Sequence, residues 1–166
     1  MRSMMIAALG AALLLAPIGV GAQTTPAAPP PPPYGMSIGF EAAKKALAAA
    51  EAEAKKNNWP VAIAIVDTGG HLVAFSKLDN TQNASVAIAI GKATTANNFK
   101  RPTKALQDAI AQGGANLRLL AVKDATPLEG GVPIVVDGKI IGGIGASGVM
   151  ANQDAEVAMA GANAAK

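Results

Sequence analysis

The sequence predicts an α+β domain in which helices pack on the faces of a largely antiparallel sheet. Apolar residues recur at helical spacing in four stretches, and short apolar runs lie between these stretches. Two pairs of short runs are separated by the turn residues Thr68-Gly69-Gly70 and Asp137-Gly138, a pattern typical of β-hairpins. Because hairpins pair neighbouring strands antiparallel, few parallel crossovers are expected.

The first 22 residues predict a signal peptide. Arg2 supplies a charged start, residues 4–20 are mostly apolar, and Val20-Gly21-Ala22 fits a cleavage site, so we expect cleavage before Gln23. A membrane helix is the alternative, but glycine and proline interrupt a run that is short for a bilayer. We therefore expect a periplasmic or secreted protein with no stable membrane insertion after cleavage.

Residues 23–36 contain the run Pro30 to Pro33 and predict an extended proline-rich spacer before a domain at 37–166. Ser37 is the expected N-cap of a helix that ends near Asn57-Asn58. The run at 61–66 is apolar throughout and predicts a strand covered on both faces, paired in a hairpin with 71–78.

The second half of the domain predicts helices at 83–98 and from a Thr103 cap to Gly113-Gly114, then a strand at 117–122. The Asp137-Gly138 turn joins strands at 132–136 and 139–144, because this dipeptide favours the positive φ of a two-residue hairpin turn. A last helix is expected at 152–164.

Composition argues against several classes of function. The formal charge is only +3, its Lys and Arg residues are scattered, and 3% of the chain is aromatic, so we expect no nucleic-acid partner. The chain has no cysteine, which excludes disulfides, thiolate metal sites and a thiol nucleophile.

Two motifs suggest functions that their context does not support. Residues 143–148 match the dinucleotide pattern G-x-G-x-x-G, but too little chain follows for another parallel strand. We interpret these glycines as positions where backbone passes close to a neighbouring segment or a ligand. Ser147 has no His/Asp partner at a recognisable spacing, so hydrolase chemistry is unsupported.

A few polar residues could form a site. His71 is the only histidine, and it is either a surface residue or an axial ligand for haem iron. Asp67 and Asp79 flank the first hairpin. They are interpreted as an acid/base pair, as a cation site or as simple turn residues. Three cations, Lys92, Lys100 and Arg101, either meet the carboxylates of a ligand or remain solvated.

Many short motifs fall in the order seen in the GlcG/HbpS family, which the chain resembles over residues 37–165. They include Val61 to Asp67, Gly70 to Phe75, Lys92-Ala93, Gly130 to Ile134, Asp137-Gly138, Ser147-Gly148 and Gln153-Asp154. The resemblance implies a profilin-like three-layer α/β/α arrangement around a five-stranded antiparallel sheet, assembly into homo-oligomers, and relatives that bind haem.

The resemblance makes an exported haem-binding or haem-handling protein our leading hypothesis, with binding expected rather than catalysis. In it, His71 is the axial metal ligand, Lys92, Lys100 and Arg101 meet the propionates, and the backbone of Gly145, Ser147 and Gly148 lines the pocket. A binder of, or enzyme for, a small organic acid as in glycolate metabolism is one alternative, with Asp67, Asp79, Lys92 and the Ser147 loop converging on it. A structural oligomer without catalysis is the other.

Overall fold

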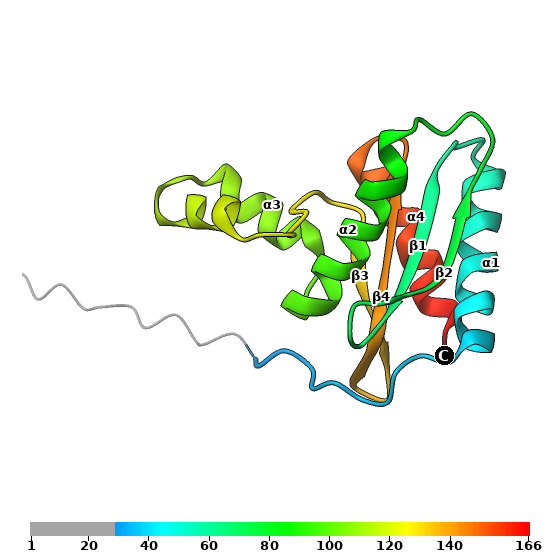
Figure 1. The fold of residues 1–166 in the computed structure, drawn as a ribbon, viewed down its shortest axis with the longest axis horizontal. Helices are drawn as coiled ribbons and strands as arrows, with labels where there is room; N and C mark the ends of the chain where they lie inside the picture. Colours follow the sequence, from blue (N-terminus) through cyan, green and yellow to red (C-terminus); the bar gives the residue numbers. More distant parts are fainter. Residues whose placement is uncertain (1–28) are drawn as a thin grey trace, which may run out of the picture.

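The computed structural model describes residues 29–166, so the predicted signal peptide and residues 23–28 of the spacer lie outside it. Figure 1 shows the elements in chain order. They are α1 (Phe40–Lys56), β1 (Ala62–Asp67), β2 (Leu72–Lys77), α2 (Ala84–Phe99), α3 (Thr103–Ala111), the 3₁₀ helix η1 (Gly114–Ala121), β3 (Gly131–Val136), β4 (Lys139–Ser147) and α4 (Ala151–Ala164).

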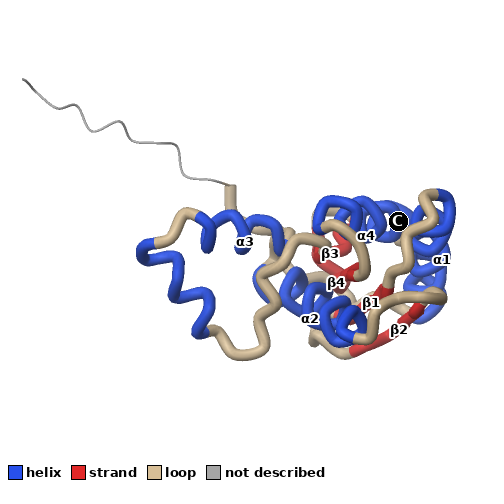
Figure 2. The backbone as a smooth tube through the Cα atoms, turned by 90° about the horizontal axis from the view of Figure 1, so that it is seen from above, coloured by secondary structure: helices blue, strands red, loops and turns tan. Residues whose placement is uncertain are grey.

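The sheet is antiparallel at every step, with the strand order β2-β1-β4-β3. Helices α1 and α4 cover one face and α2 covers the other, so the domain has three layers (Figure 2). Alternate residues of β1 face the two sides: Ile63 and Ile65 pack under α1 and α4, whereas Ala62, Ala64 and Val66 pack under α2. The prediction that this strand is covered on both faces is confirmed.

The expected five-stranded sheet is wrong, because the described residues form four strands. The segment predicted as a strand at 117–122 lies mostly in η1, on an arm that projects from the body with α3 (Figure 1). Gly113 and Gly114 have φ of 71° and 58° and break the chain between α3 and η1 on this arm. None of the η1 residues is buried, and no sheet edge lies there to pair with them.

Glycine residues of β4 let α2 lie directly on the strand. A Cβ atom at Gly145 would collide with the carbonyl oxygen of Ala89, and one at Gly143 would collide with that of Ala93. The close approach of backbones expected from this glycine-rich segment is therefore confirmed, and the helix fills the space that a dinucleotide would need.

Both hairpins are confirmed. Asp137 and Gly138 have φ of 48° and 71°, the positive values that a two-residue turn of this hand requires. In the first hairpin the register of β1 and β2 shifts between Ile65 and Val66. This bulge lies just before the turn that carries His71.

The two expected helix caps are wrong. Gly39 precedes α1, and the Ser37 hydroxyl instead hydrogen-bonds to that of Thr68. Pro102 precedes α3, and the Thr103 hydroxyl instead accepts from the N–H of Gly131 at 2.9 Å and donates to its carbonyl at 3.3 Å. A buried backbone N–H needs a hydrogen-bond acceptor, and the Thr103 hydroxyl fills this need for Gly131 instead of capping its own helix.

We call residues 29–38 the N-terminal strap, because they lie along the domain rather than away from it. The N–H of Ile140 donates to Pro33 at 2.9 Å, and the N–H of Gly35 donates to Ile140 at 2.8 Å. Ile38 is buried and donates its N–H to Ile141 at 2.7 Å. No helix in the described part of the chain is both long and apolar enough for a membrane span.

Candidate functional site

The predicted site residues form two groups along α2. Lys92, Gly145 and Ser147 are buried where α2 crosses β4, and Gly148 follows that strand half-buried. His71, Lys100 and Arg101 lie at the carboxyl-terminal end of the helix. Eight residues separate Lys92 from Lys100, about 12 Å along a helix.

The ammonium of Lys92 forms a buried ion pair. Its Nζ lies 2.8 Å from Oδ2 of Asp154, and the two side chains are 3% and 4% exposed. It also donates to the carbonyl oxygen of Ala146 at 3.0 Å. This arrangement joins α2, β4 and the start of α4 by one charged group.

Burial shapes the chemistry of this pair. Removal from water raises the pKa of Asp154, although the hydrogen bond from Lys92 opposes the rise. Oδ1 of the same carboxylate accepts the N–H of Val149 at 3.2 Å. Ser147 donates to or accepts from Ser85 at 3.3 Å in the same buried layer. The region is a satisfied polar network, and the sequence analysis did not identify Asp154 as the partner of Lys92.

The imidazole of His71 is presented to solvent at the tip of the first hairpin. Its side chain is 83% exposed, and Nδ1 lies 3.4 Å from Oδ1 of Asp67. That same oxygen accepts the backbone N–H of His71 at 2.9 Å, and this hydrogen bond is the main reason why the pKa of Asp67 is lowered. Nδ1 therefore lies beside the carboxylate, and Nε2 has no hydrogen-bond partner among the described residues.

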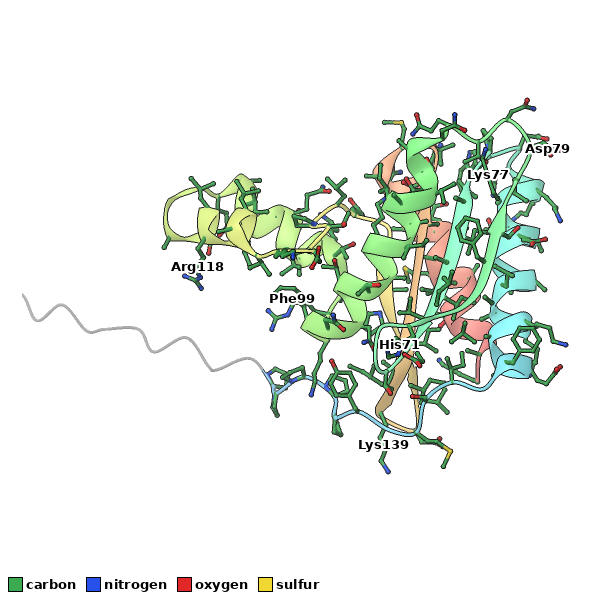
Figure 3. All side chains as sticks on the ribbon, viewed as in Figure 1. His71, Lys77, Asp79, Phe99, Arg118 and Lys139 are labelled. Carbon is green, nitrogen blue, oxygen red and sulfur yellow. The ribbon has the colours of Figure 1, made fainter. Side chains whose placement is uncertain are left out.

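The hairpin tip rests against the last turn of α2. Asn97 donates its Nδ2 to the carbonyl oxygen of Thr68 at 3.0 Å, and the Tyr34 hydroxyl donates to the carbonyl of Asn97 at 2.8 Å. Figure 3 shows His71 and Phe99 at the same end of the molecule. The strap, the hairpin tip and the end of α2 thus meet at one place.

Two cations follow α2 at this end. Lys100 has a left-handed backbone, with φ of 55°, and its Nζ lies 4.2 Å from the centre of the Tyr34 ring. Arg101 donates Nε to the carbonyl of Phe99 at 3.1 Å, which leaves its terminal nitrogens available. Together with Pro29, Pro31 and Ala105 they line a cleft of about 330 Å³.

Apolar surface accompanies these polar groups. Leu72, beside His71 in the chain, is 50% exposed, and Tyr34 is 40% exposed. Met36, next to the Ser37 that bonds to the hairpin turn, is also exposed. An imidazole, two cations and exposed apolar side chains therefore gather at one end of the domain.

The grouping expected for a small organic acid is not formed. Asp67 lies beside His71, whereas Asp79 lies at the opposite end of the molecule (Figure 3). Asp79 instead lines a cleft of about 360 Å³ with Trp59, whose partly buried ring packs on the core. Among residues 29–166, no three His, Cys, Asp or Glu side chains gather as a metal site. Haem needs only one protein ligand to iron.

A family model described as haem degrading protein HbpS-like matches residues 38–163. The chain belongs to this HbpS-like family. The resemblance of the sequence to GlcG and HbpS proteins is thereby confirmed, and the match covers nearly all of the folded domain.

Curated relatives of the HbpS-like chain include protein GlcG of Escherichia coli, which is 44% identical over 101 residues, 61% of this chain and 74% of GlcG. An uncharacterized 15.0 kDa protein from the dhaT-dhaS intergenic region of Citrobacter freundii is 34% identical over 120 residues, 71% of this chain and 84% of that protein.

Solved structures share the fold of the HbpS-like domain. Protein ORFY of Klebsiella pneumoniae has a TM-score of 0.75 at 26% identity and covers 79% of this chain and 92% of its own. HbpS has a TM-score of 0.72 at 32% identity, covering 78% and 90%. PduOC, solved in complex with haem, has a TM-score of 0.71 at 28% identity, covering 78% and 95%. Haem handling is therefore a property found in this family.

Proposed function

We propose that this protein is an exported haem-binding protein that holds haem at the end of the domain formed by the hairpin tip and the end of α2. The observation that carries the proposal is the PduOC–haem complex, whose chain is covered over 95% of its length by this fold. The single histidine, the unpaired cations and the exposed apolar side chains lie together at that end.

His71 is the proposed axial ligand. Its Nδ1 faces the Asp67 carboxylate at 3.4 Å, and its ring is largely exposed, so Nε2 is free to bind iron. A carboxylate behind a ligating imidazole fixes the ring orientation and raises its basicity. Bound haem would supply the iron and its redox chemistry, and Asp67 would hold the imidazole in place.

Lys100 and Arg101 are the proposed partners of the propionates. Neither forms an ion pair with an acidic residue among those described, and both line the same cleft. Lys92 is left out, because its ammonium is already bound to Asp154 and Ala146 in the interior. Gly145, Ser147 and Gly148 are left out because they lie against α2 or the start of β1.

The test is a haemin titration of the purified protein followed by the Soret band. We expect His71→Ala to shift the band and weaken binding by at least tenfold, and we expect added imidazole to restore the original spectrum. Lys77→Ala is the control, since Lys77 lies at the far end of β2 (Figure 3). Identical spectra and affinities for His71→Ala and the unchanged protein would remove His71 from the site, and absence of a saturable Soret change would refute haem binding.

Export is the second part of the proposal, and it rests on the charged start, the apolar run and the cleavage site in residues 1–22. We expect the secreted or periplasmic fraction to contain protein that begins at Gln23, as read by N-terminal sequencing. Protein that retains Met1 in the cytosol would contradict export and leave haem binding unaffected. Homo-oligomer formation stays a prediction, which light scattering on the purified protein tests.

A further inference from the structure

One residue of the strap, Tyr34, contacts both the end of α2 and the cation that follows it. Its hydroxyl donates to the carbonyl of Asn97 at 2.8 Å, and Asn97 in turn donates to Thr68 in the hairpin turn before His71. The face of its ring lies 4.2 Å from Nζ of Lys100. Tyr34 therefore connects the strap with both parts of the site.

The cleft beside Tyr34 has the chemistry of an anion site. Lys100 and Arg101 contribute two positive charges, and Pro29, Pro31 and Ala105 contribute apolar walls. No carboxylate of residues 29–166 lines the cleft. Its volume of about 330 Å³, at the lower end of ligand pocket sizes, is large enough for a carboxylate arm or a small dicarboxylate. Pro29 and Pro31 belong to the strap and precede residues 38–163, which the family model matches.

Lys100 occupies a backbone position that normally takes glycine. It ends α2 with φ of 55° and ψ of 34°, a left-handed conformation that costs an L-residue stability. Strained backbone of this kind clusters at ligand sites, where the side chain has a use. Here the side chain reaches the Tyr34 ring and the cleft.

We infer that the N-terminal strap is a wall of the binding site for an anionic ligand, formed by Pro29 and Pro31. Lys100 and Arg101 hold the carboxylates of that ligand, and Tyr34 positions Lys100 for them. The inference rests on the proposed function where the carboxylates are haem propionates. A free dicarboxylate is the other source of the same chemistry. The proline spacer thus contributes directly to ligand recognition.

The chain contains a single tyrosine, which permits a direct test. Protein labelled with 3-fluorotyrosine gives one ¹⁹F NMR resonance, which reports on Tyr34 alone. We expect metal-free protoporphyrin IX to shift this resonance and its dimethyl ester, which lacks free carboxylates, to leave it in place. Succinate is the free dicarboxylate in a third titration.

Substitutions of Lys100 and Arg101 test the positive charges without disturbing the fold. Lys100→Gly removes the ammonium while suiting the left-handed backbone, so the end of α2 stays intact. We expect Lys100→Gly and Arg101→Ala each to weaken protoporphyrin binding by about three- to tenfold. Lys77→Ala is the matched control, because Lys77 is exposed and lies at the opposite end of the molecule from His71, and it leaves binding unchanged (Figure 3).

Tyr34 acts through Lys100, so its variants need a second readout. Tyr34→Ala is expected to weaken porphyrin binding about three- to tenfold, whereas Tyr34→Phe keeps the ring under Lys100 and most of the affinity. The haem Soret maximum, which reports on His71, stays unchanged in both variants. A merely structural role for Tyr34 would instead alter both variants alike, together with the Soret maximum.

Failure of the two proposals gives different results. Porphyrin binding that leaves the ¹⁹F resonance unmoved would overturn the strap inference while haem binding stands. A resonance that moves with succinate, in protein that binds neither haemin nor protoporphyrin, would overturn haem binding and support the anion site. A resonance that moves with neither ligand overturns the strap inference.

Discussion

Replacing Lys92 with methionine tests how strongly the buried ion pair stabilises the fold. Methionine keeps the length and apolar stem of the side chain but leaves the Asp154 carboxylate, 4% exposed, without its cation. The carboxylate still accepts the hydrogen bond from the N–H of Val149 at 3.2 Å, whereas the carbonyl oxygen of Ala146 loses the hydrogen bond from Lys92. Breaking a buried pair on one side costs about 3–5 kcal/mol, and we expect a loss of this size in the free energy of unfolding at pH 7.

The loss should depend on pH in a definite direction. The folded-state pKa of Asp154 is already raised by burial, so its contribution to stability is present at low pH and is lost as pH rises through that pKa. Removing Lys92 takes away the hydrogen bond and charge that lower this pKa, so the pKa rises further in the variant. The variant therefore loses stability over a wider range of pH than the unchanged protein. The difference between variant and unchanged protein should be small near pH 4 and grow towards pH 7.

Urea unfolding between pH 4 and pH 7 measures this difference. Lys104→Met is the matched control, because Lys104 also lies 2.8 Å from a carboxylate, that of Asp108, but both side chains are about half exposed. We expect no measurable change in the control. A Lys92→Met loss that is equally large at pH 4 and pH 7, or no larger than that of the control, would refute the reasoning.

Substitutions at three further positions probe the rest of the scaffold, each by urea unfolding at pH 7. Gly145→Ala should cost at least about 3 kcal/mol or prevent folding, since the new methyl collides with the carbonyl of Ala89; retained stability would show that α2 can move away. Thr103→Val should cost about 1–3 kcal/mol because it leaves the buried N–H of Gly131 without its acceptor, and Thr103→Ser should recover most of this loss. Gly138→Ala should cost about 1–2 kcal/mol at a φ of 71°, and a neutral result would argue against the two-residue turn.

The parts of the fold encoded by neighbouring residues could be predicted from the sequence. Asp137-Gly138 specifies its turn within two residues, and the alternation of larger and smaller apolar residues in 61–66 reflects the two faces of β1. The run at 117–122 has the same local appearance. Its exposure follows from its place on the arm with α3 (Figure 1), and an apolar run alone does not encode that place.

The candidate site shows the same division. His71 and Lys100 could be singled out by residue type and spacing. The partners that decide their roles are distant in sequence: Asp154 is 62 residues from Lys92, and Asn97 is 63 residues from Tyr34. Without the fold, Lys92 and Lys100 look alike, yet one is buried in an ion pair and the other lines a cleft.

The projecting arm has a consequence for how the molecule opens. Residues of η1 contact mainly α3 and bury nothing, whereas β1 is covered on both faces by helices. Opening of η1 therefore exposes no core, and the amide hydrogens of η1 should exchange with solvent through frequent local opening. The amide hydrogens of β1 should exchange only when the whole domain unfolds. The molecule then consists of a cooperative unit with an independently fluctuating appendage, on which sequence and length can change without loss of the fold.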